Sequence, residues 1–96
     1  MIYRLSLYVS GESARSYAAI RHIESIAKTH LPNAYELEFV DVLKDPARAE
    51  RDKILATPTL VREQPGPRKK IMGEFANHLA VIEALEIEVY GPGAQN

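Results

Sequence analysis

Apolar and polar residues alternate along two stretches of the chain, and each stretch predicts a β-strand. Residues 2–9, IYRLSLYV, place Tyr3 and three aliphatic side chains on one face. Residues 35–42, YELEFVDV, alternate in the same way, but Glu36 and Glu38 share one of the faces. Because two carboxylates on one face are typical of a strand at the border of a sheet, residues 35–42 are expected to form an edge strand.

Three helices are predicted from caps and apolar spacing. The first begins after Ser13, a good N-cap residue, because apolar residues then recur every three or four positions. Its apolar stripe consists of Tyr17, Ala19, Ile20, Ile23, Ile26, Ala27 and His30 or Leu31. The second covers residues 46–55, since Asp45 suits the N-cap and Pro46 the first helical position. The third covers residues 78–85 and follows an asparagine that can cap it.

Two shorter strands are expected over residues 59–62 and 69–72, with a turn between them that contains Pro-Gly-Pro. Pro58 lacks an N–H donor and biases Thr57 toward an extended backbone, so the first of these strands is expected to begin just after it. The sequence leaves the isomer of the Thr57–Pro58 bond open. Residues 83–90, EALEIEVY, fit a helix at their start and a strand over their length.

The predicted order is strand, helix, strand, helix, strand, strand, helix, which is the order of the thioredoxin fold. The sequence therefore indicates one α/β domain over residues 1–90, followed by a flexible tail at 91–96. Thioredoxins carry Cys-x-x-Cys where the first strand meets the first helix, and this chain has SGES, residues 10–13, at that place. Because the chain has no cysteine, thiol redox chemistry, disulfides and thiolate metal sites are excluded.

Composition and net charge limit the kinds of partner that the chain is expected to bind. The chain has 96 residues, 46% of them hydrophobic and 26% charged, which is ordinary for one globular domain. Its formal net charge of −1 predicts no general attraction to nucleic acid or to an anionic membrane surface. No apolar run approaches the roughly 20 residues of a membrane-spanning helix, and residues 2–9 alternate where a signal peptide would be apolar throughout. A cytoplasmic location is expected.

The sequence shows no pattern typical of catalysis, a cofactor or a metal. It has no glycine-rich phosphate loop and no nucleophile elbow. His22, His30 and His78 do not have the spacing of metal ligands. The basic run at residues 68–70, RKK, fits either an acidic partner or a solvated turn.

Residues 41–60, DVLKDPARAERDKILATPTL, resemble the most characteristic stretch of the KaiB family, the small clock proteins of cyanobacteria and their relatives in other bacteria. Two further segments support the resemblance: LSLYVSGESARS, residues 5–16, and RKKIMGEF, residues 68–75. The loop at residues 64–67 and the glycine-rich tail depart from the family pattern, which is compatible with a paralogue.

The resemblance implies an adaptor without enzymatic activity that binds the hexameric ATPase KaiC and modulates its output. In cyanobacteria the family also binds KaiA and displaces the sensor histidine kinase SasA, so a KaiA-like protein or a histidine kinase is a second expected partner. The resemblance further implies a homo-oligomer, a dimer or a tetramer. It leaves two folds open: the thioredoxin-like one, and a ground state in which the C-terminal half is rearranged.

A partner-binding region is expected around Lys53. By the resemblance, Lys53 contacts an acidic face of the ATPase. The residues alone indicate instead a solvated lysine, which the C-terminus of a helix favours. Glu50 and Asp52 either join it on the exposed side or simply keep that helix soluble. Leu55 and Pro58 complete the predicted region.

The predicted edge strand offers a second surface. Its backbone groups could accept a strand from a KaiA-like partner beside Glu36 and Glu38. The same two charges could instead prevent such pairing. Tyr3, Tyr8 and Tyr90 are expected at a subunit interface, where aromatic residues are enriched.

Two other functions stay open at this point. A thioredoxin-fold enzyme acting on glutathione or peroxide would have to use Ser10 or Ser13 in place of cysteine. A sensory input domain of a SasA-like kinase would have the same fold, but the chain carries no kinase sequence.

Overall fold

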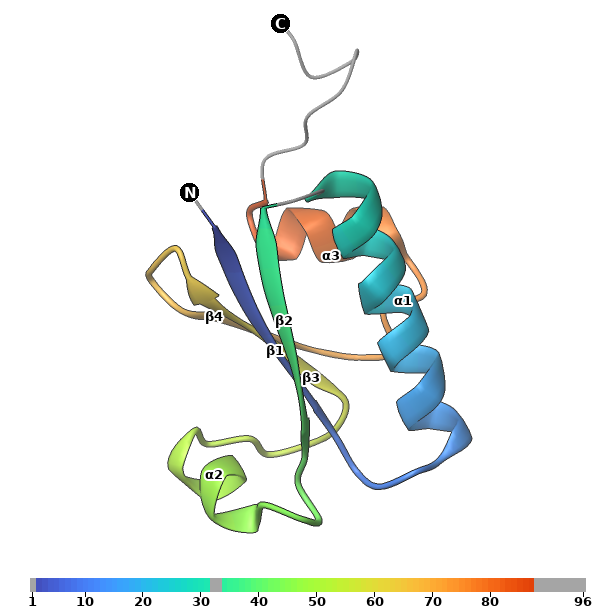
Figure 1. Cartoon of the computed structure of the whole chain (residues 1–96), viewed down its shortest axis with the longest axis vertical. Coiled ribbons are helices and arrows are strands. Elements are labelled where there is room, and N and C mark those ends of the chain that lie inside the picture. Colours follow the sequence, from blue (N-terminus) through green and yellow to red (C-terminus); the bar gives the residue numbers. More distant parts are fainter. Residues whose placement is uncertain (1, 32–33, 88–96) are drawn as a thin grey trace, which may run out of the picture.

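The computed structural model describes residues 2–31 and 34–87, which form a four-stranded sheet with three helices (Figure 1). The strands are β1 (Tyr3–Val9), β2 (Tyr35–Asp41), β3 (Thr59–Gln64) and β4 (Lys69–Met72). The helices are α1 (Ala14–His30), α2 (Pro46–Arg51) and α3 (His78–Ala84). None of these described helices is long and apolar enough to cross a membrane. The predicted order of elements is confirmed, and the domain has the thioredoxin-like arrangement.

The strands lie side by side in the order β2-β1-β3-β4. β1 and β2 are parallel, as expected for two strands connected through a helix, whereas β1 with β3 and β3 with β4 are antiparallel. Leu7 of β1 therefore lies between Phe39 of β2 and Leu60 of β3. β2 is an edge strand, as its glutamates predicted, and β1 is central.

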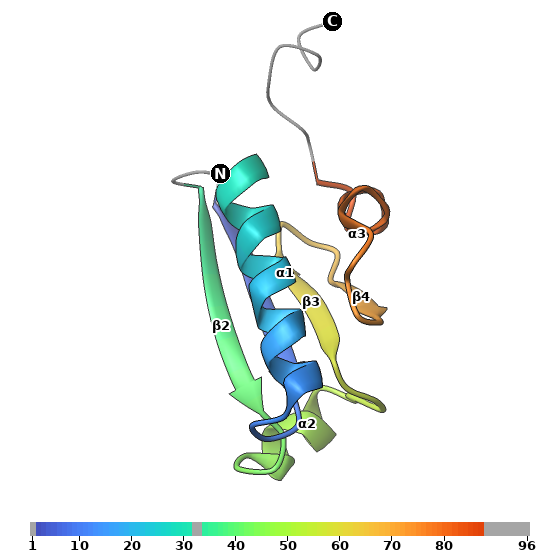
Figure 2. The same ribbon diagram turned by 90° about the vertical axis from the view of Figure 1, so that its right-hand side faces the viewer.

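α1 and α3 lie on one face of the sheet (Figure 2), and the main core fills the space between. The core combines alternate residues of β1 with apolar residues of both helices. Its members include Tyr3, Leu5, Leu7, Val9, Ile23, Ile26, Val81, Ile82 and Leu85. The period of two along residues 2–9 predicted which β1 side chains face this core, and the period of three to four predicted its members from α1.

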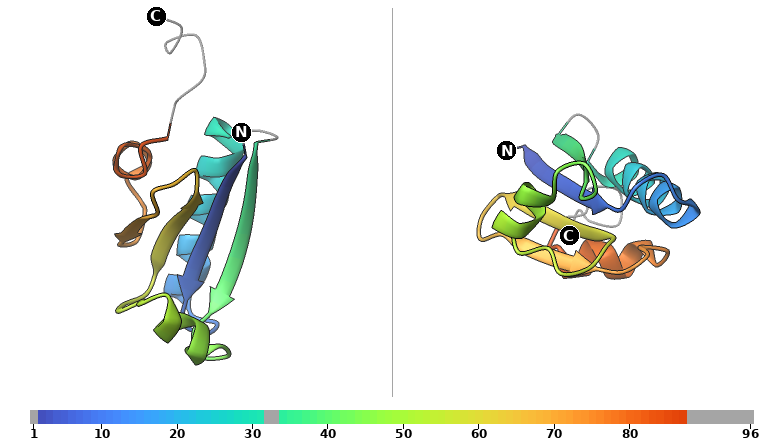
Figure 3. Two further views of the ribbon diagram at one scale, coloured as in Figure 1. Left: turned by 90° about the vertical axis from the view of Figure 1, so that its left-hand side faces the viewer. Right: turned by 90° about the horizontal axis from the view of Figure 1, so that it is seen from below.

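The opposite face of the sheet is covered at one end by α2 (Figure 3). There Tyr8, Val40 and Val61 form a second buried cluster, against which Val42 and Ile54 pack. Because α2 covers this face, β1 is buried on both of its sides, which alternation alone did not predict.

α1 begins where it was predicted. The hydroxyl oxygen of Ser13 accepts a hydrogen bond of 3.1 Å from the backbone N–H of Ser16. The prediction is wrong for Tyr17, which is exposed and whose hydroxyl donates a hydrogen bond to Glu12. Ser16 is buried instead, because the face of α1 against the sheet consists of positions 16, 19, 23, 26 and 27.

α2 ends at Arg51, earlier than predicted. Lys53 follows with a positive φ of 57°, and its N–H donates to the carbonyl of Glu50 at 3.1 Å. The N–H of Ile54 donates to the carbonyl of Ala49 at 2.9 Å. These two bonds around a left-handed residue make a Schellman motif, which ends a helix. Ile54 does not extend α2 because it turns inward to pack on the second cluster.

α3 ends in the same way, which decides the first part of the segment that fits both a helix and a strand. Glu86 has a positive φ of 56°, and the N–H of Ile87 donates to the carbonyl of Ile82 at 3.1 Å. The helix therefore stops at Ala84, and Ile87 is buried in the main core. The rest of that segment and the predicted tail, residues 88–96, lie outside the described residues.

β3 begins directly after Pro58, as predicted, and continues to Gln64, beyond its predicted end. The Thr57–Pro58 peptide bond is cis. At the far end of β2, the Asp41 carboxylate accepts hydrogen bonds from the backbone N–H groups of Gly11 and Leu43, each at 2.9 Å. Asp41 thus joins the loop before α1 to the turn before α2, and the two N–H groups hold the pKa of its carboxyl below the ordinary value.

Replacing Ser13 by alanine is expected to lower the free energy of unfolding by about 1 kcal/mol, because the N–H of Ser16 loses its acceptor. The matched control is Ser25→Ala, an exposed serine within the same helix, which should leave stability unchanged or raise it slightly, since alanine favours helices. Urea unfolding followed by circular dichroism measures both variants. Equal stabilities would contradict the capping role of Ser13.

Candidate functional site

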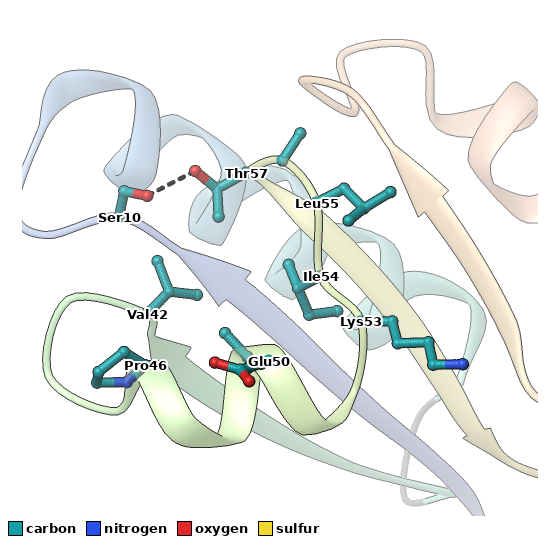
Figure 4. A pocket seen from close by; sticks show the side chains of 10 residues that line it. Ser10, Val42, Pro46, Glu50, Lys53, Ile54, Leu55 and Thr57 are labelled. Carbon is teal, nitrogen blue, oxygen red and sulfur yellow. Dashed lines mark hydrogen bonds between the residues drawn. The ribbon is translucent and has the colours of Figure 1, made fainter.

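A pocket lies between α2, the loop that follows it and the end of β1 (Figure 4). Its volume is about 670 Å³ and its walls are largely apolar. The walls include Val42, Pro46, Ala49, Ile54, Ser10 and Thr57. Three of the predicted partner-binding residues, Glu50, Lys53 and Leu55, also line it, so the structure brings them together.

Two leucines near this pocket are exposed to solvent. Leu55 is 91% exposed, and Leu43, in the turn between β2 and α2, is 70% exposed. Burying a leucine side chain against a partner would contribute about 2 kcal/mol. The sequence did not predict Leu43 as a candidate binding residue, because no periodic pattern assigns a turn residue to a face.

Lys53 occupies the left-handed position that ends α2, where glycine is usual. A lysine at this position costs about 1 kcal/mol relative to glycine. Figure 4 shows its side chain extending outward from the loop after α2. A strained residue that exposes a charged side chain at a pocket is typical of a functional surface, since stability alone would favour glycine.

Asp52 differs from its neighbours because its side chain is only 16% exposed. Its Oδ2 accepts a short hydrogen bond from the hydroxyl of Tyr8, and this bond is the main reason that the pKa of Asp52 lies below its ordinary value. Burial, followed by the bond to Asp52, raises the pKa of Tyr8 to about 12. The phenol therefore keeps its proton at neutral pH and donates a hydrogen bond to the Asp52 carboxylate. Because this carboxylate is turned toward the sheet, it is less accessible to a partner protein than its neighbours are.

Arg48 joins α2 to the sheet, a role that was not predicted from the sequence. Its two terminal nitrogens donate to the two carboxylate oxygens of Glu38 at 2.6 and 2.7 Å. Its guanidinium carbon lies 5.8 Å from the centre of the Tyr8 ring, and its Nε lies 3.7 Å from Asp52. The hydrogen bonds from Arg48 lower the pKa of Glu38. The i,i+4 spacing of Arg48 and Asp52 was visible in the sequence, but the contacts with Glu38 and Tyr8 were not.

The outer edge of β2 has no neighbouring strand within the described part of the chain. Glu36 pairs with Arg4 at 3.2 Å, and Glu38 pairs with Arg48. Both carboxylates project from a face of the sheet, as alternation along a strand requires. Because each is matched by an arginine of the same chain, their charges repel an added strand less than isolated glutamates would.

The predicted subunit-interface tyrosines are not at the surface of this fold. Tyr3 is 8% exposed and belongs to the main core, whereas Tyr8 is 0% exposed and belongs to the second cluster. Both are packed within their own chain, so in this fold neither presents its ring to a second subunit. Pro58, predicted in the partner-binding region, is likewise buried. Tyr90 lies outside the described residues.

The structure brings together two histidines that are distant in the sequence. Nδ1 of His22 in α1 lies 3.0 Å from Nε2 of His78 in α3, and the rings meet edge to face. Within residues 2–31 and 34–87 no group of three or more potential metal ligands occurs. We therefore interpret the His22–His78 contact as a hydrogen bond that joins α1 to α3, the two helices that share the main core.

The serines at the position of the thioredoxin cysteines are engaged by their neighbours. Oγ of Ser10 lies 2.6 Å from Oγ1 of Thr57, and Oγ of Ser13 caps α1 and donates to Oγ of Ser16. In these contacts neither serine meets a histidine or a carboxylate, the groups that activate a hydroxyl as a nucleophile.

Arg48→Met is expected to lower the free energy of unfolding by about 1–2 kcal/mol, because Glu38 and Asp52 lose a charged partner. The effect is moderate because the Glu38 side chain is 56% exposed and its charge is screened by water. Arg51→Met removes the same charge from the same helix but from an exposed side chain, so it should change stability by less than about 0.5 kcal/mol. Urea unfolding compares them, and equal losses would show that Arg48 does not join α2 to the sheet.

Tyr8→Phe is expected to make stability less sensitive to acid. The pKa of Asp52 is below its ordinary value of 3.8 in the folded chain, so the carboxylate contributes stability above that value and loses it as the pH falls through the lower folded value. Removing the Tyr8 hydroxyl removes the main cause. The difference in free energy of unfolding between wild type and Tyr8→Phe should therefore be constant above about pH 5 and shrink below about pH 4. A constant difference down to about pH 2 would refute this linkage.

Solved structures of other proteins show the same fold. The N-terminal domain of SasA from Synechococcus elongatus matches with a TM-score of 0.75 over 95% of this chain and 89% of that one, at 19% identity. Mitochondrial thioredoxin 3 from Saccharomyces cerevisiae matches with a TM-score of 0.70 over 88% of this chain and 76% of that one, at 18% identity. At such identities the likeness concerns the fold alone, and it confirms the thioredoxin-like prediction.

Sequence comparison identifies the family. The KaiB domain model matches residues 6–87. Circadian clock protein KaiB3 from Synechocystis sp. is 42% identical over 83 residues, which are 86% of this chain and 81% of that protein. Circadian clock oscillator protein KaiB from Acaryochloris marina is 42% identical over 85 residues, which are 88% of this chain and 82% of that protein. The chain therefore belongs to the KaiB family of circadian clock proteins.

Proposed function

We propose that this chain is an adaptor without enzymatic activity that binds a KaiC-like hexameric ATPase and modulates its output. The observation that carries the proposal is the exposure of Leu55 beside Lys53, in the loop after α2. Membership of the KaiB family supports the choice of an ATPase as the partner.

The pocket offers the chemistry of a docking surface. An apolar centre surrounded by charged residues is the usual composition of a protein interface, and here Leu55 and the apolar walls are accompanied by Lys53 and Glu50. The Lys53 ammonium would pair with a carboxylate of the partner, which sets the orientation and speeds association. Leu55 would supply the buried apolar contact.

The edge of β2 is proposed as a second surface, for a KaiA-like protein or a histidine kinase. A strand at the edge of a sheet offers unpaired backbone groups to an added strand. The arginine partners of Glu36 and Glu38 lower the electrostatic cost of such an addition. Assembly into a dimer or a tetramer remains a prediction, since the tyrosines expected to support it are buried in this fold.

No observation favours the enzyme hypothesis. Catalysis by Ser10 or Ser13 would need an activating base. The hydroxyl of Ser10 bonds to the hydroxyl of Thr57, and that of Ser13 bonds to the hydroxyl and the backbone N–H of Ser16. The likeness to the SasA domain concerns the fold and adds no argument for a role as a kinase input domain.

The test is co-elution in size-exclusion chromatography with the KaiC homologue of the same organism, with and without ATP, after long incubation. Lys53→Glu should weaken binding at least tenfold, because it reverses the charge that is proposed to pair with a carboxylate of the partner. Leu55→Ala should weaken it by about tenfold through lost apolar burial. The charge-matched control is Lys28→Glu, on the exposed surface of α1, which should bind as wild type does.

A further variant separates binding from stability. Lys53→Gly is expected to leave the free energy of unfolding unchanged or to raise it by up to about 1 kcal/mol, because glycine suits the left-handed position. The same variant is expected to weaken binding, because it removes the ammonium group. Wild-type affinity in both Lys53→Glu and Lys53→Gly would reject the proposed docking surface.

A further inference from the structure

The loop that carries Lys53 begins at a helix end, and a helix end leaves carbonyl groups that need donors. The Schellman bonds use the carbonyls of Ala49 and Glu50. The carbonyls of Asp52 and Lys53 lie two and three residues after Glu50, at the point where the backbone turns left-handed. A donor placed at these two oxygens would fix the direction in which the loop leaves α2.

Lys70 of β4 supplies that donor. Its Nζ lies 2.7 Å from the carbonyl oxygen of Asp52 and 3.3 Å from that of Lys53. A cation at the C-terminal end of a helix also interacts favourably with the partial negative charge of the carbonyls. The contact joins residues 17 and 18 positions apart in the sequence, from an edge strand to the end of a helix.

The register of β4 explains why Lys70, and not the lysine before it, reaches α2. Lys70 lies opposite Val61, a member of the second cluster, so it stands on the face of the sheet that α2 covers. Lys69 lies opposite Arg62 and pairs with Glu86 at 3.2 Å, after α3. Successive residues of a strand point to opposite faces, so the two lysines of the basic run have different contacts.

We infer that Lys70 is a positioning residue for the docking surface: by holding the carbonyls of Asp52 and Lys53, it keeps the loop after α2 in the conformation that presents Lys53 and Leu55. The inference rests on the proposed function. Lys70 need not touch the partner itself. Without its ammonium group, the strained left-handed turn at Lys53 would lose its contact with β4 and keep the Schellman bonds and the contacts of Asp52 and Ile54 with the sheet. The partner would then have to supply part of the order of the loop on binding.

The test compares Lys70→Met with Lys69→Met, which remove the same charge from the same strand but from opposite faces. The first measurement needs no partner: amide hydrogen exchange of Lys53 and Ile54, whose N–H groups form the Schellman bonds, read against the amides of β1. Lys70→Met should accelerate exchange at these two amides about tenfold and leave β1 unchanged. Lys69→Met should leave both unchanged.

The second measurement is the affinity for the KaiC homologue. Lys70→Met should weaken binding about tenfold, and Lys70→Arg, which keeps a cationic donor, should recover part of the loss. Unchanged exchange at Lys53 and Ile54 in Lys70→Met would overturn the inference whatever the affinity. Faster exchange with wild-type affinity, in a system where Lys53→Glu binds poorly, would show that Lys70 holds the loop but does not prepare it for docking.

The same pair of measurements separates the two proposals. Wild-type affinity in Lys53→Glu rejects the docking surface, and with it the role of Lys70 in docking. The exchange rates would then still report whether Lys70 holds the end of α2.

Discussion

The hydrogen bond from Tyr8 to Asp52 is the contact on which the candidate site depends. Tyr8 is fully buried in the central strand, and a buried hydroxyl without a partner costs several kilocalories per mole. Asp52 follows the last residue of α2, so the bond fixes the end of that helix over the sheet. Lys53 is the next residue along the chain. Holding Asp52 therefore also fixes the start of the turn that leads to Leu55.

Arg48 and Lys70 hold the same helix from its two sides. Arg48 joins α2 to the edge strand through Glu38 and faces the Tyr8 ring. Lys70 reaches the end of α2 from the other edge of the sheet. A helix of six residues is too short to be stable by itself, so these side-chain contacts and the second cluster have to supply its stability. The position of the proposed docking loop is therefore a property of the whole sheet.

The two faces of the sheet have different tasks. α1 and α3 bury the main core on one face, which provides the stability of the domain. The other face carries the small cluster around Tyr8 and the charged pairs of Arg4, Arg48 and their glutamates. Both proposed binding surfaces, the loop after α2 and the outer edge of β2, adjoin this second face. Arg48 touches residues of both.

Local signals in the sequence predicted the starts of elements well. Ser13, Asp45 and Asn77 each accept a hydrogen bond from the N–H three residues later, which is an interaction within one helical turn. The end of α2 was predicted too late, because a left-handed lysine is disfavoured locally and is held by contacts with β4 and the second cluster. The burial of Tyr3 and Tyr8, which were predicted at a subunit interface, also depends on contacts between elements. Alternation shows which residues share a face of a strand, but not what covers that face.

By itself, the sequence determined the order of strands and helices, the edge position of β2 and the stretch around Lys53 that marks the KaiB family. These depend on short-range periodicity, caps and motif residues that are contiguous in the chain. Only the tertiary structure decided that Asp52 faces inward, that Arg48 pairs with Glu38, and that Lys70 rather than Lys69 reaches α2. Each of these contacts joins side chains from different elements, and their meeting depends on strand register and helix placement, which no local pattern encodes.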